Sequence, residues 1–103
     1  MLLEITVSFE GPDAVLTVEG EVDLGSIDTL AACLEQTVES GSGRVCVDMT
    51  GVTFLDSTGL NVLLRAHQAL AEAERELVLR RPAENVRRVL TVAAIDGVLK
   101  IED

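Results

Sequence analysis

Between residues 54 and 60 the chain reads FLDSTGL, a passage from an apolar run into what we predict is the first turn of a helix. Asp56 or Ser57 is the expected N-cap, because either side chain can accept hydrogen bonds from N–H groups that a first turn leaves unpaired. The Ser57 hydroxyl would lie at the positive end of the helix dipole, where the fold tolerates a phosphate. Gly59 would leave the backbone open to close approach by another chain. Taken alone, the stretch predicts only a helix cap.

Hydrophobic periodicity on both sides of this stretch predicts elements in the order β-β-α-β-α-β-α-β. Residues 3–10 alternate between apolar and polar side chains, which indicates a strand with one buried face, and the turn GPD leads into a second strand at 14–19. Residues 20–25 are then predicted to form a loop. The other strands are predicted at 45–49, 77–79 and 98–101, and the helices begin near residues 26, 56 and 82.

The fold class expected from this order is α/β, with a single domain over residues 1–103. Residues 45–49 and 77–79 are almost wholly apolar, which is typical of central strands covered on both faces. The strand–helix–strand units should be right-handed crossovers. The expected architecture is a mixed sheet, made of one hairpin and parallel strands, with helices packed against it.

Candidate catalytic and metal-binding residues are scarce. His67 is the one histidine, and it falls within the apolar stripe of the second helix, predicted as Leu60, Leu63, Leu64, Leu70 and Ala71. Packing is therefore favoured over catalysis for this side chain. Cys33 and Cys46 match no disulfide framework or metal motif, and the chain has no phosphate-binding loop or dinucleotide motif. We predict a protein that is not an enzyme, with no catalytic residues, no metal site and no cofactor.

The formal net charge of −10 lies in the first half of the chain. Residues 1–56 contain eleven acidic residues and one arginine, whereas residues 57–103 contain seven acidic and seven basic residues. Such a surface repels DNA, RNA and anionic lipid, so no direct nucleic-acid or membrane partner is expected. It would attract a basic protein surface, although solubility alone is the simpler explanation of the charge.

Four arginines occur between residues 80 and 88, near the predicted third helix. The expected position of the arginines is the outer face of the third helix and the residues leading into it: Arg80, Arg81, Arg87 and Arg88.

No apolar stretch approaches the ~20 residues that span a bilayer. The N-terminal residues lack the pattern of a signal peptide. A cytoplasmic location is therefore expected.

The stretch FLDSTGL resembles the signature of the STAS-domain family, and in particular of the bacterial anti-sigma-factor antagonists. Three further segments resemble the same family in the same order: GEVD at 20–23, VCVDMTGV at 45–52 and PAENVRRVL at 82–90. The likeness extends over essentially the whole chain. It departs at ERE, 74–76, where a glycine pair is common, and at AID, 94–96, where Gly-Leu-Asp is frequent. The departures leave the subfamily open.

The resemblance implies partner switching. In such proteins a cognate anti-sigma factor, itself a serine kinase, phosphorylates the serine that corresponds to Ser57. The unphosphorylated antagonist binds the anti-sigma factor and so releases the sigma factor, and a serine phosphatase acting on phosphorylated Ser57 restores binding. The residues that the resemblance implies in partner binding are Asp23, Asp56, Ser57, Thr58, Gly59 and Asn61.

Two other functions remain open. The chain could be a non-catalytic STAS subunit of a lipid-transport or stress-signalling complex that has no phosphorylation cycle, with Ser57 serving only as a cap. It could also be an enzyme or a nucleotide-binding domain, because a fold does not determine function. The lack of a phosphate-binding loop and of an acid–base pair disfavours the last of these.

Overall fold

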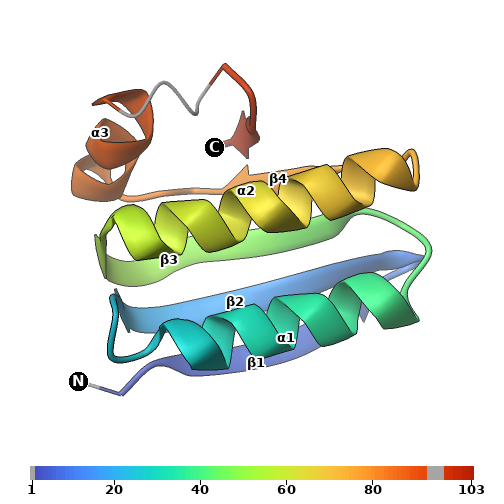
Figure 1. The fold of residues 1–103 in the computed structure, drawn as a ribbon, viewed down its shortest axis with the longest axis horizontal. Coiled ribbons are helices and arrows are strands. Elements are labelled where there is room, and N and C mark those ends of the chain that lie inside the picture. The colour runs from blue at the N-terminus through green and yellow to red at the C-terminus, as the bar shows by residue number, and fades with distance from the viewer. Residues whose placement is uncertain (1, 93–96) are drawn as a thin grey trace.

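The computed structural model describes residues 2–92 and 97–103, which form one five-stranded sheet and three helices. Figure 1 shows this arrangement, and the element order β-β-α-β-α-β-α-β is the predicted one. The strands are β1 (Glu4–Glu10), β2 (Asp13–Val22), β3 (Val45–Leu55), β4 (Leu77–Arg80) and β5 (Lys100–Glu102). The helices are α1 (Ile27–Ser40), α2 (Ser57–Glu72) and α3 (Glu84–Val92).

The strands lie in the sheet in the order in which they occur along the chain, from β1 to β5. β1 and β2 pair antiparallel, whereas the pairs β2–β3, β3–β4 and β4–β5 are parallel. Right-handed crossovers that advance in one direction place their helices on one face of the sheet. All three helices accordingly contribute to a single core with the same face of the sheet, and the α/β prediction with a mixed sheet is confirmed.

The core combines the inward side chains of the strands with one face of each helix. In α2 the inward set differs from the prediction, because Val62 and Ala66 are buried whereas Ala71 is exposed. In α3, Val86 and Leu90 are buried as predicted. The predicted inward residue Ala93 and the segment at 94–96 lie outside the described residues.

Two strands are longer than predicted by several residues. β2 continues through residues 20–22, which were expected to be loop, and β3 continues to Leu55. The register between them shifts at Thr17/Glu19 and again at Gly20/Glu21, and Gly20 adopts a φ of +119°. These irregularities interrupt the alternation of apolar and polar side chains. The periodicity of β2 alone therefore did not indicate that the strand continues past Glu19 by pairing with β3.

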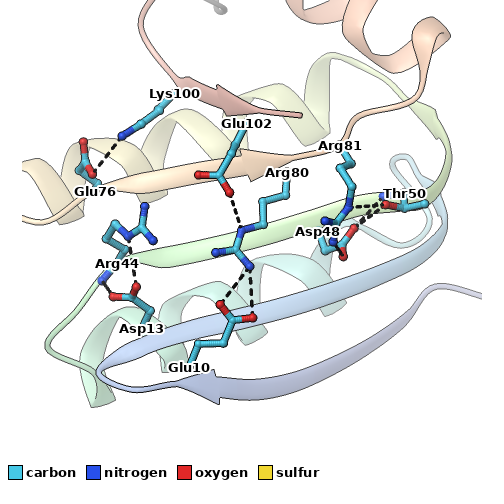
Figure 2. Close-up of polar contacts among 10 residues, drawn as sticks. All are labelled: Glu10, Asp13, Arg44, Asp48, Thr50, Glu76, Arg80, Arg81, Lys100 and Glu102. Atoms are coloured by element: carbon cyan, nitrogen blue, oxygen red, sulfur yellow. Dashed lines mark hydrogen bonds and ion pairs between the residues drawn. The ribbon is translucent and has the colours of Figure 1, made fainter.

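The central strands were expected to be covered on both faces, but one face of the sheet carries none of the described helices. Val15, Cys46 and Val78 are buried on this face, although none of the three helices covers it. Figure 2 shows charged side chains lying across it, and their ion pairs are Arg80–Glu10 at 3.3 Å, Arg80–Glu102 at 3.1 Å and Arg44–Asp13 at 3.2 Å. The aliphatic parts of long charged side chains can cover apolar surface in this way.

One of the four arginines lies elsewhere than predicted. Arg80 belongs to β4, and Arg81 pairs with Asp48 of β3 at 2.6 Å. Arg87 and Arg88 lie on α3, where they pair with Asp103 and Glu84. Arg81, Arg87 and Arg88 therefore lie on α3 or in the segment leading into it, as predicted, whereas Arg80 does not, because β4 is one residue longer than its apolar run.

The edge strand β1 is less buried than its alternation predicts. Ile5 packs against the core, but Val7 and Phe9 remain 41% and 66% exposed. Their cross-strand partners are Leu16 and Ala14, so both side chains lie on the face that carries the helices. The pattern correctly indicates which side faces the core, but the helices do not extend over its outer end.

Candidate functional site

Asp56 is the residue that caps α2. Its carboxylate oxygen Oδ1 accepts hydrogen bonds from the backbone N–H of Thr58 at 3.0 Å and of Gly59 at 3.3 Å, and from the Thr58 hydroxyl. Its backbone is extended, and its carbonyl accepts the first helical bond, from Leu60. These are the features of an N-cap, and they decide between the two candidates that the sequence offered.

The same contacts set the charge state of Asp56. The hydrogen bond from the Thr58 hydroxyl, with those from the backbone of Gly59 and Thr58, lowers the pKa of the Asp56 carboxyl below its ordinary value, while partial burial opposes this. Hydrogen bonds to the ionised form favour it. Asp56 is therefore a carboxylate at neutral pH, and it already accepts hydrogen bonds from the N–H groups of Thr58 and Gly59 in the first turn.

Ser57 is the first residue of α2, and its side chain is exposed. Its hydroxyl makes no hydrogen bond with any residue that the structure describes. Because Asp56 caps the helix, the hydroxyl of Ser57 has no structural task within the first turn. It can be reached from solvent at the positive end of the helix dipole.

Gly59 has a role other than the one predicted. It is buried, and a Cβ at this position would lie 2.5 Å from Cδ1 of Leu55 and 2.7 Å from Cγ1 of Val22. The close approach that requires a glycine is therefore made by the chain's own strands, β2 and β3. Gly59 allows α2 to start directly against the sheet, and it does not face the outside.

A backbone hydrogen bond joins the loop of Asp23 to the start of α2. The N–H of Asp56 donates to the carbonyl of Val22 at 3.2 Å, so the ends of β2 and β3 lie together. The carboxylate of Asp23 accepts from the backbone N–H of Ser26 at 3.2 Å, and Ser26 Oγ donates to the Glu21 carbonyl at 2.7 Å. Ser26 precedes α1 as predicted, but its side chain holds the loop and caps no N–H of the helix.

Thr58 and Asn61 face a shallow hollow between the starts of α1 and α2. Asp28 and Ala31 of α1 also line it, as does Arg65 of α2. A second hollow of about 400 Å³ continues from it between the same helices; its lining is largely apolar, with Glu35 and Glu39 also contributing. The predicted residues Thr58 and Asn61 therefore lie beside a groove that the sequence did not indicate.

Two exposed apolar side chains near the same end of the sheet were not predicted. Leu24 follows β2 and is 76% exposed, and Phe54 lies in β3 opposite Glu21 and is 47% exposed. Exposed aromatic and aliphatic side chains beside charged groups are common anchors of protein interfaces. The signal in the sequence is that Phe54 is one of only two aromatic residues and lies within the FLDSTGL stretch.

Other chemistry is not evident in the part of the chain that the structure describes. His67 is half-buried on α2, as its place in the apolar stripe predicts. No group of three or more metal-ligating side chains occurs within residues 2–92 and 97–103. None of the described helices is long and apolar enough to cross a membrane.

With the fold and this geometry established, comparison with known proteins identifies the family. A sequence model described as "Mlab, STAS domain" matches residues 5–101. The chain belongs to the STAS-domain family. The anti-sigma-B factor antagonist of Listeria monocytogenes is 27% identical to this STAS domain over 86 residues, which are 84% of the chain and 75% of that relative.

Solved structures give the same fold. An anti-sigma factor antagonist from Mycobacterium paratuberculosis matches with a TM-score of 0.82 at 25% identity, over 97% of this STAS domain and 85% of that chain. The anti-sigma factor antagonist SpoIIAA of Bacillus, in its unphosphorylated form, matches with a TM-score of 0.80 at 18% identity, over 95% and 87%. SpoIIAA has also been solved in a phosphorylated form. This domain is thus related to the anti-sigma-factor antagonists at low identity.

Proposed function

We propose that this STAS domain is an anti-sigma-factor antagonist that is switched by phosphorylation of Ser57. In the unphosphorylated form it binds a cognate anti-sigma factor, which is a serine kinase, and the sigma factor is released. Phosphorylation by that kinase ends the interaction, and a serine phosphatase restores it. The domain itself carries out no catalysis.

The observation that carries this proposal is that Asp56, and not Ser57, caps α2. Asp56 supplies the helix cap, and Ser57 presents an exposed hydroxyl with no hydrogen bond to the described residues. A hydroxyl that only stabilised the fold would be expected to bond to the first turn. The relatives named anti-sigma-factor antagonists, and SpoIIAA in its two forms, support the same function.

The electrostatics of the site explain how one phosphate could act as a switch. Phosphorylation adds about −1.5 to −2 charge. The N–H groups of Thr58 and Gly59 that would neutralise it are already bonded to Asp56, so the dianion would remain uncompensated beside a carboxylate. Burying such a charge unpaired costs several kcal/mol, and each ~1.4 kcal/mol is tenfold in affinity. Binding is lost while the helix start, which favours an anion, stays folded.

The proposed partner surface is built from the exposed groups around Ser57. Thr58 and Asn61 border the shallow hollow, Asp23 lies in the adjoining loop, and Leu24 and Phe54 supply exposed apolar contacts. Gly59 is left out of this surface because it is buried. The apolar residues would provide most of the affinity, and the carboxylates would select a basic partner.

The experiment that tests the proposal is phosphorylation in vitro. The cognate kinase and ATP should transfer one phosphate to Ser57, and phosphopeptide mapping should locate it there. Modification of Thr58, or none with a kinase whose activity has been verified, would remove the mechanism. Thr58 is an internal control next to Ser57, and it should stay unmodified because its hydroxyl is bonded to Asp56 while that of Ser57 is not.

An alternative is a STAS subunit of a lipid-transport or stress-signalling complex, which binds its partner without a phosphorylation cycle. The same exposed surface around Leu24 and Phe54 would serve such a complex. Identification of the protein that co-purifies with the unphosphorylated domain separates the two. A serine kinase supports the switch, whereas a transporter or a scaffold protein supports the alternative.

A further inference from the structure

The outer edge of β1 has free backbone hydrogen-bonding groups. β1 forms one edge of the sheet, and among the described residues it pairs with β2 alone. Gly11 and Pro12 form the two-residue loop of the β1–β2 hairpin, between Glu10 and Asp13. The residues that flank such a loop make a hydrogen-bonded pair, and bonded pairs alternate from there. The even-numbered residues of β1 therefore bond to β2, and the odd-numbered ones direct their N–H and C=O groups outward.

The same odd-numbered residues carry apolar side chains that the core does not cover. Val7 and Phe9 lie on the helix-bearing face with 41% and 66% of their surfaces exposed, next to Ile5, which is half-buried. An edge that combines unpaired backbone groups with exposed apolar side chains is a template for the addition of another strand. Phe9 is the larger of these side chains and offers the most apolar surface to such a strand.

We propose that β1 is the interface of a homodimer, in which the β1 strands of two copies pair antiparallel about a two-fold axis at Thr6. In this register Ile5 of one copy lies opposite Val7 of the other, and Leu3 lies opposite Phe9. The bonded pairs are then odd-numbered on both strands, as the free edge requires. The apolar side chains of the two copies meet on the helix-bearing face, and the two sheets become continuous.

The charges on the other face of β1 exclude one competing register and are compatible with a second copy as the occupant. With the axis at Thr6, Glu4 lies opposite Ser8 of the other copy, so no like charges are opposed. The neighbouring register with odd-numbered bonded pairs, centred on Val7, would place Glu4 opposite Glu10 in both halves of the dimer, which is unfavourable. Registers centred on Ile5 or Ser8 also oppose no like charges, but the one centred on Thr6 pairs Leu3, Ile5, Val7 and Phe9 with one another. A two-fold axis lets a single strand be its own complement in this way.

This dimer does not depend on the proposed phosphorylation switch, because Ser57 follows β3, two strands away from the open edge. It also responds to salt in the opposite sense. Each copy carries a net charge of −10, so screening should strengthen the dimer, whereas it should slow association with a basic partner. Failure of one proposal can therefore be distinguished from failure of the other.

Sedimentation of the full chain, from micromolar to near-millimolar protein, tests the association. We expect a monomer–dimer equilibrium whose dissociation constant falls as salt rises. Phe9→Lys should raise that dissociation constant by at least about tenfold, because the dimer would then bury two lysine charges, one from each copy, in an apolar interface. Val92→Lys is the matched control, because Val92 is 82% exposed on α3 and should leave the equilibrium unchanged. A monomer at every concentration, or equal weakening by both variants, overturns the proposal.

Disulfide trapping tests the register. Thr6 and Ser8 are both exposed on the same face of β1, so Thr6→Cys and Ser8→Cys should both fold. Only Thr6→Cys places two cysteines opposite each other across the axis, within the distance that a disulfide spans. Mild oxidation should therefore give a covalent dimer with Thr6→Cys, and little with Ser8→Cys or with the wild-type chain, which has Cys33 and Cys46. Preferential trapping of Ser8→Cys overturns the proposed pairing.

Discussion

The backbone N–H of Asp56 donates a hydrogen bond to the carbonyl of Val22 at 3.2 Å, and this bond joins the two segments that form the candidate site. Asp23 follows the acceptor and Ser57 follows the donor, so a carboxylate loop and a helix start leave the sheet from adjacent strand ends. Two segments more than thirty residues apart in the sequence thereby form one surface. The proposed switch needs this adjacency, because a phosphate on Ser57 acts on what surrounds it.

Substitution of Ser57 separates a switch from a cap. Ser57→Ala should leave the melting temperature nearly unchanged, because the cap is Asp56, and should still bind the anti-sigma factor. Ser57→Asp should bind more weakly, though less weakly than the phosphorylated protein, because a carboxylate carries one negative charge and fewer acceptor oxygens. Titration of each variant against the partner, with thermal melts, gives the answer. Tight binding by Ser57→Asp together with early melting of Ser57→Ala would make Ser57 a structural residue.

The pH dependence of stability should contain a contribution from Asp56. Its pKa is lowered in the folded state, first by the hydrogen bond from Thr58. A group of this kind stabilises the fold fully above its unfolded pKa of about 3.9, and the stabilisation is lost as the pH falls through the lower, folded pKa. Asp56→Asn keeps a capping side chain without the charge.

Urea unfolding of the wild type and of Asp56→Asn, from neutral pH to pH 3 and below, measures this contribution. The wild type should be more stable by a few tenths of a kcal/mol to about 1 kcal/mol at neutral pH. The two unfolding free energies should converge at acid pH. A difference that stays constant over the whole range would show that the charge of Asp56 does not contribute.

Gly59 should be intolerant of a methyl group although it lies in a helix. Alanine favours a helix interior by up to ~1 kcal/mol over glycine, but overpacking costs about 1–3 kcal/mol. The added Cβ would press on Leu55 and Val22 at 2.5 and 2.7 Å, so we expect net destabilisation of about 1 kcal/mol or more. Gly97→Ala, which meets nothing within 4 Å, is the matched control.

A double-mutant cycle can assign the effect of Gly59→Ala to packing. Val22→Ala removes the atom nearest to the new methyl group on the β2 side. The two substitutions together should cost less than the sum of their separate effects. Additive effects, measured by chemical unfolding, would mean that the helix start and not the contact with Val22 requires glycine.

The fold could be predicted because its signals are local in the sequence. The site could be predicted only in part, because it depends on contacts between segments that are far apart in the sequence. Alternation and helical spacing indicate each element and the inward face of each strand. They do not indicate how far α1 extends over β1, so the exposure of Phe9 could not be foreseen. The extension of β2 past Gly20 depends on pairing with β3 across a bulge. Side-chain geometry is needed to decide that Asp56 and not Ser57 is the cap. Leu24 and Phe54 become candidate contact residues only because the ends of β2 and β3 are joined in the fold.

Association with the proposed basic partner should slow as salt rises, because screening reduces long-range steering. Asp28→Asn should lower the on-rate at low salt, since Asp28 lines the hollow beside Thr58 and Asn61. Glu72→Gln removes one charge from the last residue of α2, at the opposite end of that helix from Thr58 and Asn61, and should have a smaller effect. An on-rate measured by stopped flow that is indifferent to salt and to both variants would show that the acidic surface serves only solubility.

The last prediction concerns Arg80, whose side chain is only 13% exposed on the helix-free face of the sheet. It lies between Glu10 and Glu102, with Nε 3.1 Å from the Glu102 carboxylate in a geometry that makes no hydrogen bond. Both carboxylates are well hydrated, at 59% and 43% exposure. Exposed ion pairs contribute about 0–1 kcal/mol, so we expect the aliphatic part of Arg80, over Cys46 and Val78, to contribute more than its charge.

Arg80→Ala and Arg80→Met distinguish these two contributions. Alanine removes both the charge and the cover, and should destabilise the domain by about 1–2 kcal/mol. Methionine removes the charge but keeps a long apolar side chain over Cys46, and should remain within about 0.5 kcal/mol of the wild type. Chemical unfolding at low and high salt provides the measurement, and the loss in Arg80→Ala should be the same in both. Equal destabilisation by the two variants, reduced by salt, would instead mean that the ion pairs and not the covering of the apolar face make Arg80 important.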